Sequence, residues 1–556
     1  MPNAAILFEP DGYLTGGDRL MGRQSAGAGF LRAAVAASQG QTIWGYTPNP
    51  QSAEVFQRLV REIDASADPK WLAAHRLDLL GQIGTLYLPV PGLANSARLR
   101  LRAGASAYSL VGVTHTTSSH EAMDAITDLL SAPVMPWDAL ICTSAAVAGT
   151  VAVLIEEQFA YLRWRFGRQV SFVLPQFPII PLGVHTADFV FSEEARSKAR
   201  AALGIAADET VALFVGRLSF HAKAHPHAMY VGLEQVARAS GSKIVLLQCG
   251  WFGNEAIEKA FKDGQARLSP SVRAIWSEGR DPQARKQAWA AGDFFVSLSD
   301  SIRESFGLTP IEAMAAGLPC IVSDWDGYKD TVRDGIDGFR IATLMPPAGL
   351  GAAYATGYEA GTSDYDMLCA QTSRGIAVDI GALGRRLGEV VGSPELRRKL
   401  GESGRQRARE TFDWRVIFRR YQQLWDDLTE RRAKARGDKA VTARWRAAPR
   451  EYPSRADPFR AFGHYATAHV TPQSLLALAP GASHASYQAL SNDPVFNLGE
   501  PFEPDDVRQI VYLLEKGPLQ IKVIADATNI AMGRVIMAAS VLAKMGLVSI
   551  GEVSAQ

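Results

Sequence analysis

The segment 301–319 combines carboxylates with a glycine and a signal for the start of a helix. It reads Ser-Ile-Arg-Glu-Ser-Phe-Gly-Leu-Thr-Pro-Ile-Glu-Ala-Met-Ala-Ala-Gly-Leu-Pro. Thr309 suits a helix cap, Pro310 suits the first helical position, and Glu312 at the third would complete a capping box. Gly307 lets backbone amides approach a ligand closely. Because a helix N-terminus presents free N–H groups and partial positive charge, this pattern predicts a diphosphate site.

The carboxylates of Glu304 and Glu312 leave a second interpretation open. Glu312 would then only complete the capping box, and Glu304 would be an ordinary surface carboxylate. Capping boxes are common, so the spacing of these two residues alone does not separate a ligand site from a local helix signal.

Two cations stand upstream of this segment. Residues 214–218 read Phe-Val-Gly-Arg-Leu, and Lys223 follows shortly after. Arg217 and Lys223 are the residue types that neutralise phosphates. The alternative for Arg217 is a structural ion pair.

The elements that must position these residues alternate between strands and helices. In the first series we expect strands at 4–8, 41–46, 85–88, 107–113 and 139–143, and helices at 24–38 and 53–65. In the second we expect strands at 211–215, 243–248, 272–276, 294–297 and 320–323, and helices at 228–239, 283–291 and 310–316. Such alternation predicts parallel sheets covered by helices on both faces. The proline-rich segment 175–184 separates the series, so we expect an α/β protein with two doubly wound domains and a cleft between them.

The rest of the chain has a different character. Residues 344–379 are glycine-rich and predict an irregular insertion, whereas 380–428 are helical in pattern. Residues 430–460 hold ten Lys/Arg against four Asp/Glu, which predicts a basic connector draped over the surface. The alternative for this connector is peripheral contact with an anionic membrane.

The last segment, 500–556, predicts helices followed by a strand, in an order that resembles a winged helix-turn-helix domain. It carries five Lys/Arg against seven Asp/Glu. Phosphate contacts supply most DNA affinity, so DNA is not the expected partner. We expect packing, self-association or a protein partner through this segment.

Composition sets the outer limits. The chain has 556 residues, 47% of them apolar, and Lys+Arg 58 against Asp+Glu 57. This length predicts two to four domains, and this charge balance gives no overall attraction to polyanions. The four cysteines form no Cys-x-x-Cys pair, which argues against a disulfide framework and a structural zinc site. With no signal peptide and no long uninterrupted apolar run, we expect a cytoplasmic protein.

Together these motifs resemble those of the retaining nucleotide-sugar glycosyltransferases of family four, which have the GT-B fold. The likeness rests on Glu304-x7-Glu312 with Ser-Phe-Gly between them, and on the Gly-Arg-Leu run with Lys223. It also includes the surrounding segments 180–184, 291–297, 332–339 and 412–414. It is strongest across 175–335, weaker across 1–174 and 380–428, and absent after about residue 435.

The resemblance implies roles for the charged residues. Arg217 and Lys223 would neutralise the donor diphosphate in place of a metal ion. Lys223 follows the arginine by one position more than is usual in the family. Glu312 would accept from both ribose hydroxyls, and Glu304 would face the sugar ring.

The resemblance also assigns the remaining donor contacts. Amides near the start of the helix would hold the sugar and diphosphate, and the other contacts would come from a glycine and the next strand: Phe306, Gly307, Leu308, Thr309, Gly216, Trp276 and Ser277. In the first domain, Gly16 and Gly17 would let a loop run close to the donor, although a plain glycine turn is equally consistent with this pair.

Residues of the first domain would complete the site. His115 follows a strand and resembles the histidine that supports the transferred sugar; a core or surface histidine is the alternative, and His120 is a rival. Arg23 or Gln24 would contact the acceptor.

Three patterns suggest metal binding and are interpreted otherwise. Asp324 and Asp326 match an Asp-x-Asp metal motif of another glycosyltransferase fold, but they follow a late strand of the second domain. The same motif recurs at Asp364 and Asp366. The third pattern is a histidine group around Lys223, where a metal cation would be repelled: His221, His225 and His227.

We therefore expect a retaining, metal-independent glycosyltransferase with a UDP- or GDP-linked sugar donor, no cofactor, and a glycan or lipid-linked acceptor. The expected domains are an acceptor domain at 1–180, a donor domain at 181–415, a closing helix at 416–430, a basic linker at 431–499 and the winged-helix-like segment 500–556. The alternatives are a nucleotide-sugar epimerase or hydrolase of the same fold, and a non-catalytic adaptor acting through the tail.

Overall fold

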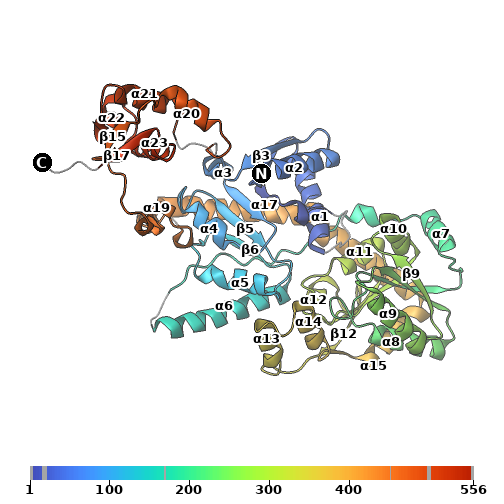
Figure 1. Cartoon of the computed structure of the whole chain (residues 1–556). Helices are drawn as coiled ribbons and strands as arrows, with labels where there is room; N and C mark the ends of the chain where they lie inside the picture. Colours follow the sequence, from blue (N-terminus) through green and yellow to red (C-terminus); the bar gives the residue numbers. More distant parts are fainter. Residues whose placement is uncertain (1–3, 15–21, 168–170, 451, 497–501, 552–556) are drawn as a thin grey trace. The chain divides into compact units, whose positions relative to one another are not determined.

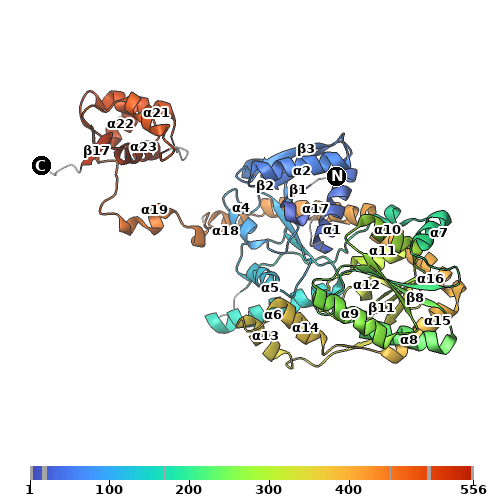
Figure 2. The same ribbon diagram turned by 45° about the vertical axis from the view of Figure 1, so that its right-hand side comes forward.

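The computed structural model describes residues 4–14, 22–167, 171–450, 452–496 and 502–551. The chain forms two compact units, Met1–Tyr452 and Pro453–Gln556. Each unit is described by itself (Figures 1 and 2).

The first domain contains, within the described residues, a six-stranded parallel sheet in the order β3-β2-β1-β4-β5-β6. Its strands are β1 (Ala5–Leu7), β2 (Thr42–Thr47), β3 (Asp68–Ala73), β4 (Thr85–Leu88), β5 (Ser109–Val113) and β6 (Ala139–Ile141). Its helices are α1 (Gly22–Ser38), α2 (Pro50–Ile63), α3 (Leu77–Ile83), α4 (Ala94–Arg100), α5 (His120–Thr127) and α6 (Ala145–Phe166). The edge strand β3 was not predicted, because its sequence Asp-Pro-Lys-Trp-Leu-Ala lacks an apolar run.

The second domain repeats this plan, with a described six-stranded parallel sheet in the order β12-β11-β10-β7-β8-β9. Its strands are β7 (Thr210–Val215), β8 (Ile244–Gly250), β9 (Arg273–Glu278), β10 (Phe294–Ser297), β11 (Cys320–Ser323) and β12 (Gly338–Ile341). Its helices are α7 (Glu193–Ala202), α8 (His227–Ser240), α9 (Glu255–Leu268), α10 (Pro282–Ala291), α11 (Leu308–Ala316), α12 (Tyr328–Thr331), α15 (Ile380–Gly392) and α16 (Pro394–Arg407).

Both faces of each sheet are buried. In β7, Val211 and Leu213 lie in one apolar core, and Ala212 and Phe214 lie in another. Successive side chains of a strand point to opposite faces, so helices cover both sides. The expected α/β class with two Rossmann-like domains is confirmed.

A long helix, α17 (Trp414–Gly437), follows the second domain but packs in the core of the first. The hinge joins it through Val184, whose N–H donates to the Phe412 carbonyl at 2.8 Å. We expected the closing helix to end at residue 430 and an irregular linker to follow. Instead α17 reaches Gly437 and α18 (Lys439–Arg446) comes next.

The physical reason for this correction is that the basic residues are used inside the fold. Arg432 is buried and donates to the Gly84 carbonyl and, at 2.7 Å, to the Ser109 hydroxyl. Asp438 caps α18, accepting from the Ala440 N–H at 2.8 Å. The charge run therefore does not form a uniformly solvated connector.

The insertion is also more regular than expected. Its stem is an antiparallel pair, β13 (Thr343–Leu344) with β14 (Ala377–Val378). Two helices lie between these strands, α13 (Ala352–Glu359) and α14 (Tyr365–Ser373).

The second unit surrounds one apolar core. Its described elements are α19 (Pro458–Ala461), β15 (Leu475–Leu478), α20 (His484–Ser491), α21 (Pro504–Leu514), β16 (Leu519–Gln520), α22 (Ile521–Thr528), α23 (Met532–Lys544) and β17 (Val548–Gly551). The strands pair antiparallel in the order β16-β15-β17. The order of helices before β17 agrees with the expectation, whereas assignment to the winged-helix class stays a prediction. Arg534 of α23 is paired with Asp506, which leaves it less available to phosphates.

Candidate active site

The start of α11 is built around a glycine. Gly307 has φ +81°, and a Cβ there would lie 2.2 Å from the Tyr328 ring. Gly307 is the N-cap residue, and no described side chain caps the helix. Because glycine alone tolerates both the conformation and the contact, the free N–H groups of this helix turn are left for a ligand.

The capping box predicted here is wrong. The helix begins at Leu308, so Thr309 and Pro310 take its second and third positions rather than the cap and the first. Glu312 then lies beyond the third position and does not serve the helix end. This outcome removes the local explanation for Glu312.

The Glu312 carboxyl lies half-buried among cations. Burial raises its pKa to about 7, and the positive charges of Arg285 and Lys223 oppose that rise. The carboxyl is therefore poised between its neutral and charged forms near neutral pH. A ligand that donates hydrogen bonds to it would favour the charged form.

The lysine of the upstream run reaches the first glutamate of the motif. Lys223 Nζ forms an ion pair with Glu304, and both side chains are largely buried. Burial alone would lower the pKa of Lys223, but the Glu304 carboxylate more than offsets this and the pKa is raised. Gly216 lies against this lysine and has φ +149°, a conformation that favours glycine; a Cβ there would make an ordinary contact of 3.5 Å with the Lys223 Cε.

Arg217 lies beside this pair with its charge uncompensated by contact. Among the ion pairs of the described chain, none includes Arg217, which argues against the structural alternative. Burial lowers its pKa, and repulsion by Arg303 adds to this effect. Its guanidinium lies 5.5 Å from the Trp251 ring centroid. Such a half-buried cation without an ion-pair partner in the described chain favours an anionic ligand.

The first domain meets the motif directly. The Ser305 hydroxyl donates to the His115 carbonyl at 2.8 Å, and the Ser144 hydroxyl donates to the Ser305 carbonyl at 2.8 Å. The His115 side chain is half-buried; burial lowers its pKa to about 4, with a smaller effect from Arg23. The imidazole is therefore neutral near pH 7. The contact through its carbonyl places His115 next to Ser305, which follows Glu304 in the chain.

Two carboxyls missed by the sequence analysis lie near the same centre. Asp326 adopts φ +49°, and one of its carboxylate oxygens is buried without a hydrogen-bond partner in the described structure. Burial raises its pKa well above the usual value, and the charge of Glu304 adds to this. Burial also raises the pKa of Asp300 to about 7. Asp326 was visible only as part of an Asp-x-Asp pattern, and nothing in the sequence marked Asp300.

The insertion reaches from the second domain to the first. The Tyr365 hydroxyl lies 2.7 Å from the Ser118 hydroxyl. The Tyr358 ring stacks on the His120 ring, with centroids 3.5 Å apart. Asp366 pairs with Arg303. His120, the rival histidine, therefore contacts the insertion.

The remaining predicted residues fall into three groups. Trp276 and Ser277 lie on β9, where the Trp276 ring centroid is 5.6 Å from that of Phe252. Gly16 and Gly17 lie outside the described residues. Arg23 and Gln24 lie in the first turn of α1, in the domain where the acceptor contacts are expected.

The metal-like patterns have other partners. Asp324 lies 3.5 Å from Arg340, and Asp364 caps α14 by accepting from the Met367 N–H at 2.8 Å. Across the described ranges, no three His, Cys, Asp or Glu side chains gather as a metal site.

Comparison with known proteins gives the class of the second domain. The family described as "Glycosyl transferases group 1" matches residues 195–344. These residues contain Arg217, Lys223, Glu304 and Glu312, so the stretch that holds the candidate site is similar to a group 1 glycosyl transferase domain.

Named relatives match about a quarter of the chain. The D-inositol 3-phosphate glycosyltransferase of Nocardia farcinica is 32% identical over 148 residues, which is 26% of this chain and 32% of that protein. The protein of the same name from Mycobacterium bovis is 33% identical over 157 residues, 28% of this chain and 30% of that protein. The chain thus spans about a third of the length of these relatives.

Solved structures also align with this chain. Anabaena Alr3699/HepE in complex with UDP aligns with a TM-score of 0.48 and 15% identity, over 77% of this chain and 100% of that one. Sucrose-phosphate synthase from Thermosynechococcus elongatus aligns with a TM-score of 0.46 and 18% identity, over 77% of this chain and 99% of that one.

Proposed function

We propose that the protein is a retaining glycosyltransferase that moves a sugar from a UDP- or GDP-linked donor to a hydroxyl of a glycan, lipid-linked or other acceptor. The observation that carries this proposal is the gathering of Arg217, Lys223 and Glu304, with Glu312 beside Lys223, at the free start of α11. Two cations and a helix N-terminus suit a diphosphate, and the flanking carboxylates suit sugar hydroxyls.

In this proposal the donor diphosphate is the leaving group. Arg217 and Lys223 stabilise the charge that grows on it as the bond from the anomeric carbon to the phosphate oxygen breaks. The acceptor oxygen forms the new bond on the same face, and the departing phosphate oxygen takes the acceptor proton. These fixed charges do the work that a divalent metal does elsewhere, so no cofactor is required.

The carboxylates orient the donor. Glu304 is held by Lys223 before the donor binds, and the donor phosphates compete for that lysine. Glu304 is then free to accept from the sugar, while Glu312 accepts from the ribose. His115, neutral at pH 7, supports the transferred sugar from the first domain.

The comparison with the relatives does not identify the acceptor of this protein. Their name specifies inositol 3-phosphate, but the match covers only 26% of this chain, and acceptor residues are expected in the first domain, outside the range of the family match. We place the activity in the cytoplasm, in the synthesis of cell-surface polysaccharide or another glycoconjugate.

A panel of nucleotide sugars, read by release of nucleoside diphosphate, tests the proposal. Release that depends on an added glycan or lipid-linked acceptor supports a transferase, and release of free sugar without acceptor favours the hydrolase alternative. No release, together with no thermal shift from UDP or GDP, would favour the non-catalytic adaptor.

A further inference from the structure

Helix α6 of the first domain leaves apolar side chains uncovered. Its first turns pack against the sheet, where Val147 and Val151 lie in the core. At its other end the aromatic rings face outward: Trp164 is 75% exposed, Phe166 60% and Tyr161 52%. The Tyr161 and Trp164 rings adjoin, with centroids 5.8 Å apart, and exposed apolar surface of this kind marks an interaction site.

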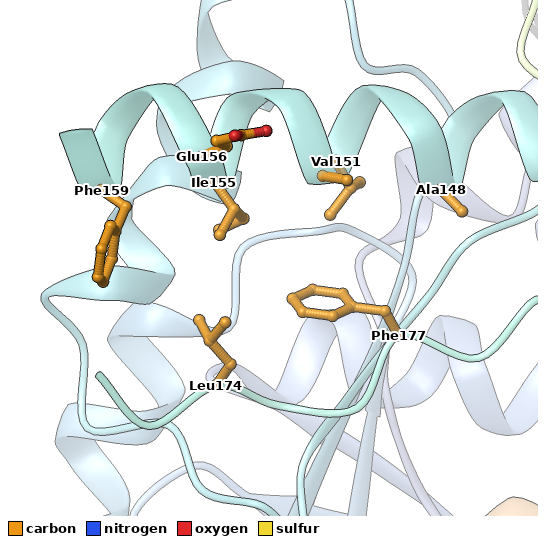
Figure 3. A pocket seen from close by; sticks show the side chains of 8 residues that line it. Ala148, Val151, Ile155, Glu156, Phe159, Leu174 and Phe177 are labelled. Carbon is orange, nitrogen blue, oxygen red and sulfur yellow. The ribbon is translucent and has the colours of Figure 1, made fainter. Parts of the chain in front are cut away.

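An apolar groove of about 360 Å³ runs beside the same helix (Figure 3). Val151, Ile155 and Phe159 point from α6 toward Leu174 and Phe177 of the returning chain. The groove is lined by none of the cations or carboxylates of the candidate active site. The groove is therefore separate from the candidate active site.

Arginines alternate with the aromatic residues at this end of the helix. The sequence 161–166 is Tyr-Leu-Arg-Trp-Arg-Phe, and neither Arg163 nor Arg165 forms an ion pair in the described part of the chain. The Arg163 guanidinium lies 5.4 Å from the Phe159 ring, so the groove and the exposed rings adjoin. The nearest carboxylates of the helix, Glu156 and Glu157, lie about 9 Å or more from Arg163 along the helix axis.

The hydropathy and exposure of α6 indicate what kind of partner it would bind. Its most apolar stretch has a mean hydropathy of 1.3, and only 11% of that stretch is buried. The length and composition would allow it to cross a membrane, but Val147 and Val151 fix its start to the sheet. The helix dipole by itself favours arginines at the C-terminus of a helix. It does not explain why the aromatic rings beside them are exposed.

We propose that the tip of α6, residues 159–166, docks the protein onto an anionic lipid bilayer. Trp164, Phe166 and Tyr161 enter the interface, where amphipathic rings are favoured. Arg163 and Arg165 stay at the level of the lipid phosphates, with their alkyl stems against the rings. The tip belongs to the first domain, where the acceptor contacts are expected, as a lipid-linked acceptor would require.

Sedimentation of the full-length protein with lipid vesicles tests this proposal. We expect binding to vesicles of phosphatidylcholine with phosphatidylglycerol, and weak binding to phosphatidylcholine alone. Trp164→Ser/Phe166→Ser is expected to lower the affinity on the order of tenfold or more, because apolar burial is lost. Arg163→Gln/Arg165→Gln is expected to lower it roughly fivefold for each charge and to remove the salt dependence.

Matched controls keep the test decisive. Phe459→Ser/Tyr465→Ser removes rings of similar exposure, 70% and 76%, from the second unit and is expected to leave binding unchanged. Equal binding of all variants, or no binding to anionic vesicles, would overturn the proposal. A shift from dimer to monomer caused by Trp164→Ser/Phe166→Ser in the absence of lipid would assign the tip to self-association instead. The vesicle readout needs no sugar transfer, so its outcome is independent of the proposed enzymatic activity.

Discussion

Among single residues, Arg217 has the clearest expected effect. It is half-buried, repelled by Arg303 and without an ion-pair partner in the described chain, so its charge is available to a diphosphate. Arg217→Ala is expected to lower the rate of transfer about 10²- to 10³-fold, as for other preorganised charges that stabilise a leaving group. The melting temperature should stay the same or rise, because a buried unpaired charge is removed.

The matched control for Arg217 is Arg238→Ala, which removes an exposed arginine that pairs with the buried Glu234. It should leave nucleoside diphosphate release unchanged. Full activity in Arg217→Ala would contradict the assignment of this residue to the donor.

Glu312 predicts a pH dependence of donor affinity. Its pKa is raised to about 7 by burial, so donor hydrogen bonds to the carboxylate are fully available only above that pH. Affinity for a nucleotide sugar should rise as the pH increases through 7 and then level off. Calorimetric titration from pH 5.5 to 8.5 would show this, and Glu312→Gln should bind weakly at every pH without that rise.

The same group predicts the opposite trend for stability. The folded-state pKa of Glu312 lies above the ordinary value of 4.5, so ionisation destabilises the fold progressively between pH 4.5 and about 7. Glu312→Gln should therefore gain stability over the natural protein at pH 8 but not at pH 4. Melting temperatures of Glu312→Gln and the natural protein that differed by the same amount at every pH from 4 to 8 would exclude the raised pKa.

Among the elements, the insertion formed by residues 343–378 is expected to control how readily the acceptor reaches the candidate active site. Tyr365 and Tyr358 hold it to the first domain through hydroxyl contacts and one ring stack, and α13 has no buried residue in the described structure. Such contacts exchange readily with water, so the insertion is weakly fastened. Tyr358→Ala/Tyr365→Phe should speed hydrogen exchange at 345–376 and change the KM for acceptor several-fold.

Measuring the donor affinity of this double variant distinguishes an effect on the acceptor from a general loss of structure. That affinity should be unchanged in Tyr358→Ala/Tyr365→Phe, because the residues at α11 are untouched. Tyr354→Phe, on the same helix, serves as the control and should resemble the natural protein. A double variant that lost donor binding to the same extent as acceptor binding would contradict the assignment.

The elements also show what the sequence could predict. The two sheets follow from alternating apolar runs and helical periodicity, because local pattern and burial agree there. The start of α11 could not be predicted. Gly307 packs closely against the Tyr328 ring and takes the N-cap position, so Thr309 does not cap the helix as its sequence pattern indicated. Asp326 and the insertion contacts depend on backbone conformation and on neighbours distant in sequence, which a local pattern does not contain.

The whole molecule depends on α17, which returns from the second domain to the core of the first (Figure 1). Phe30 lies between Phe418 and Tyr421, at ring-centroid distances of 5.6 and 5.5 Å. Trp425, also from α17, is fully buried. Large aromatic side chains of this kind cost several kcal/mol each when removed, about 3–5 kcal/mol. The first domain is therefore incomplete without the residues that follow the second.

Two truncations test this dependence. A chain of residues 1–452 keeps α17 and α18 and should fold, bind the donor and release nucleoside diphosphate as the full chain does, because Pro453–Gln556 forms a separate unit with its own core. A chain of residues 1–413 loses α17 and should expose the Phe30 surface, aggregate and show no cooperative melting transition. Circular dichroism and size-exclusion chromatography distinguish these results. Soluble, cooperative folding of the shorter chain would show that the two domains are independent, and loss of folding in the longer one would show that the second unit is needed by the first.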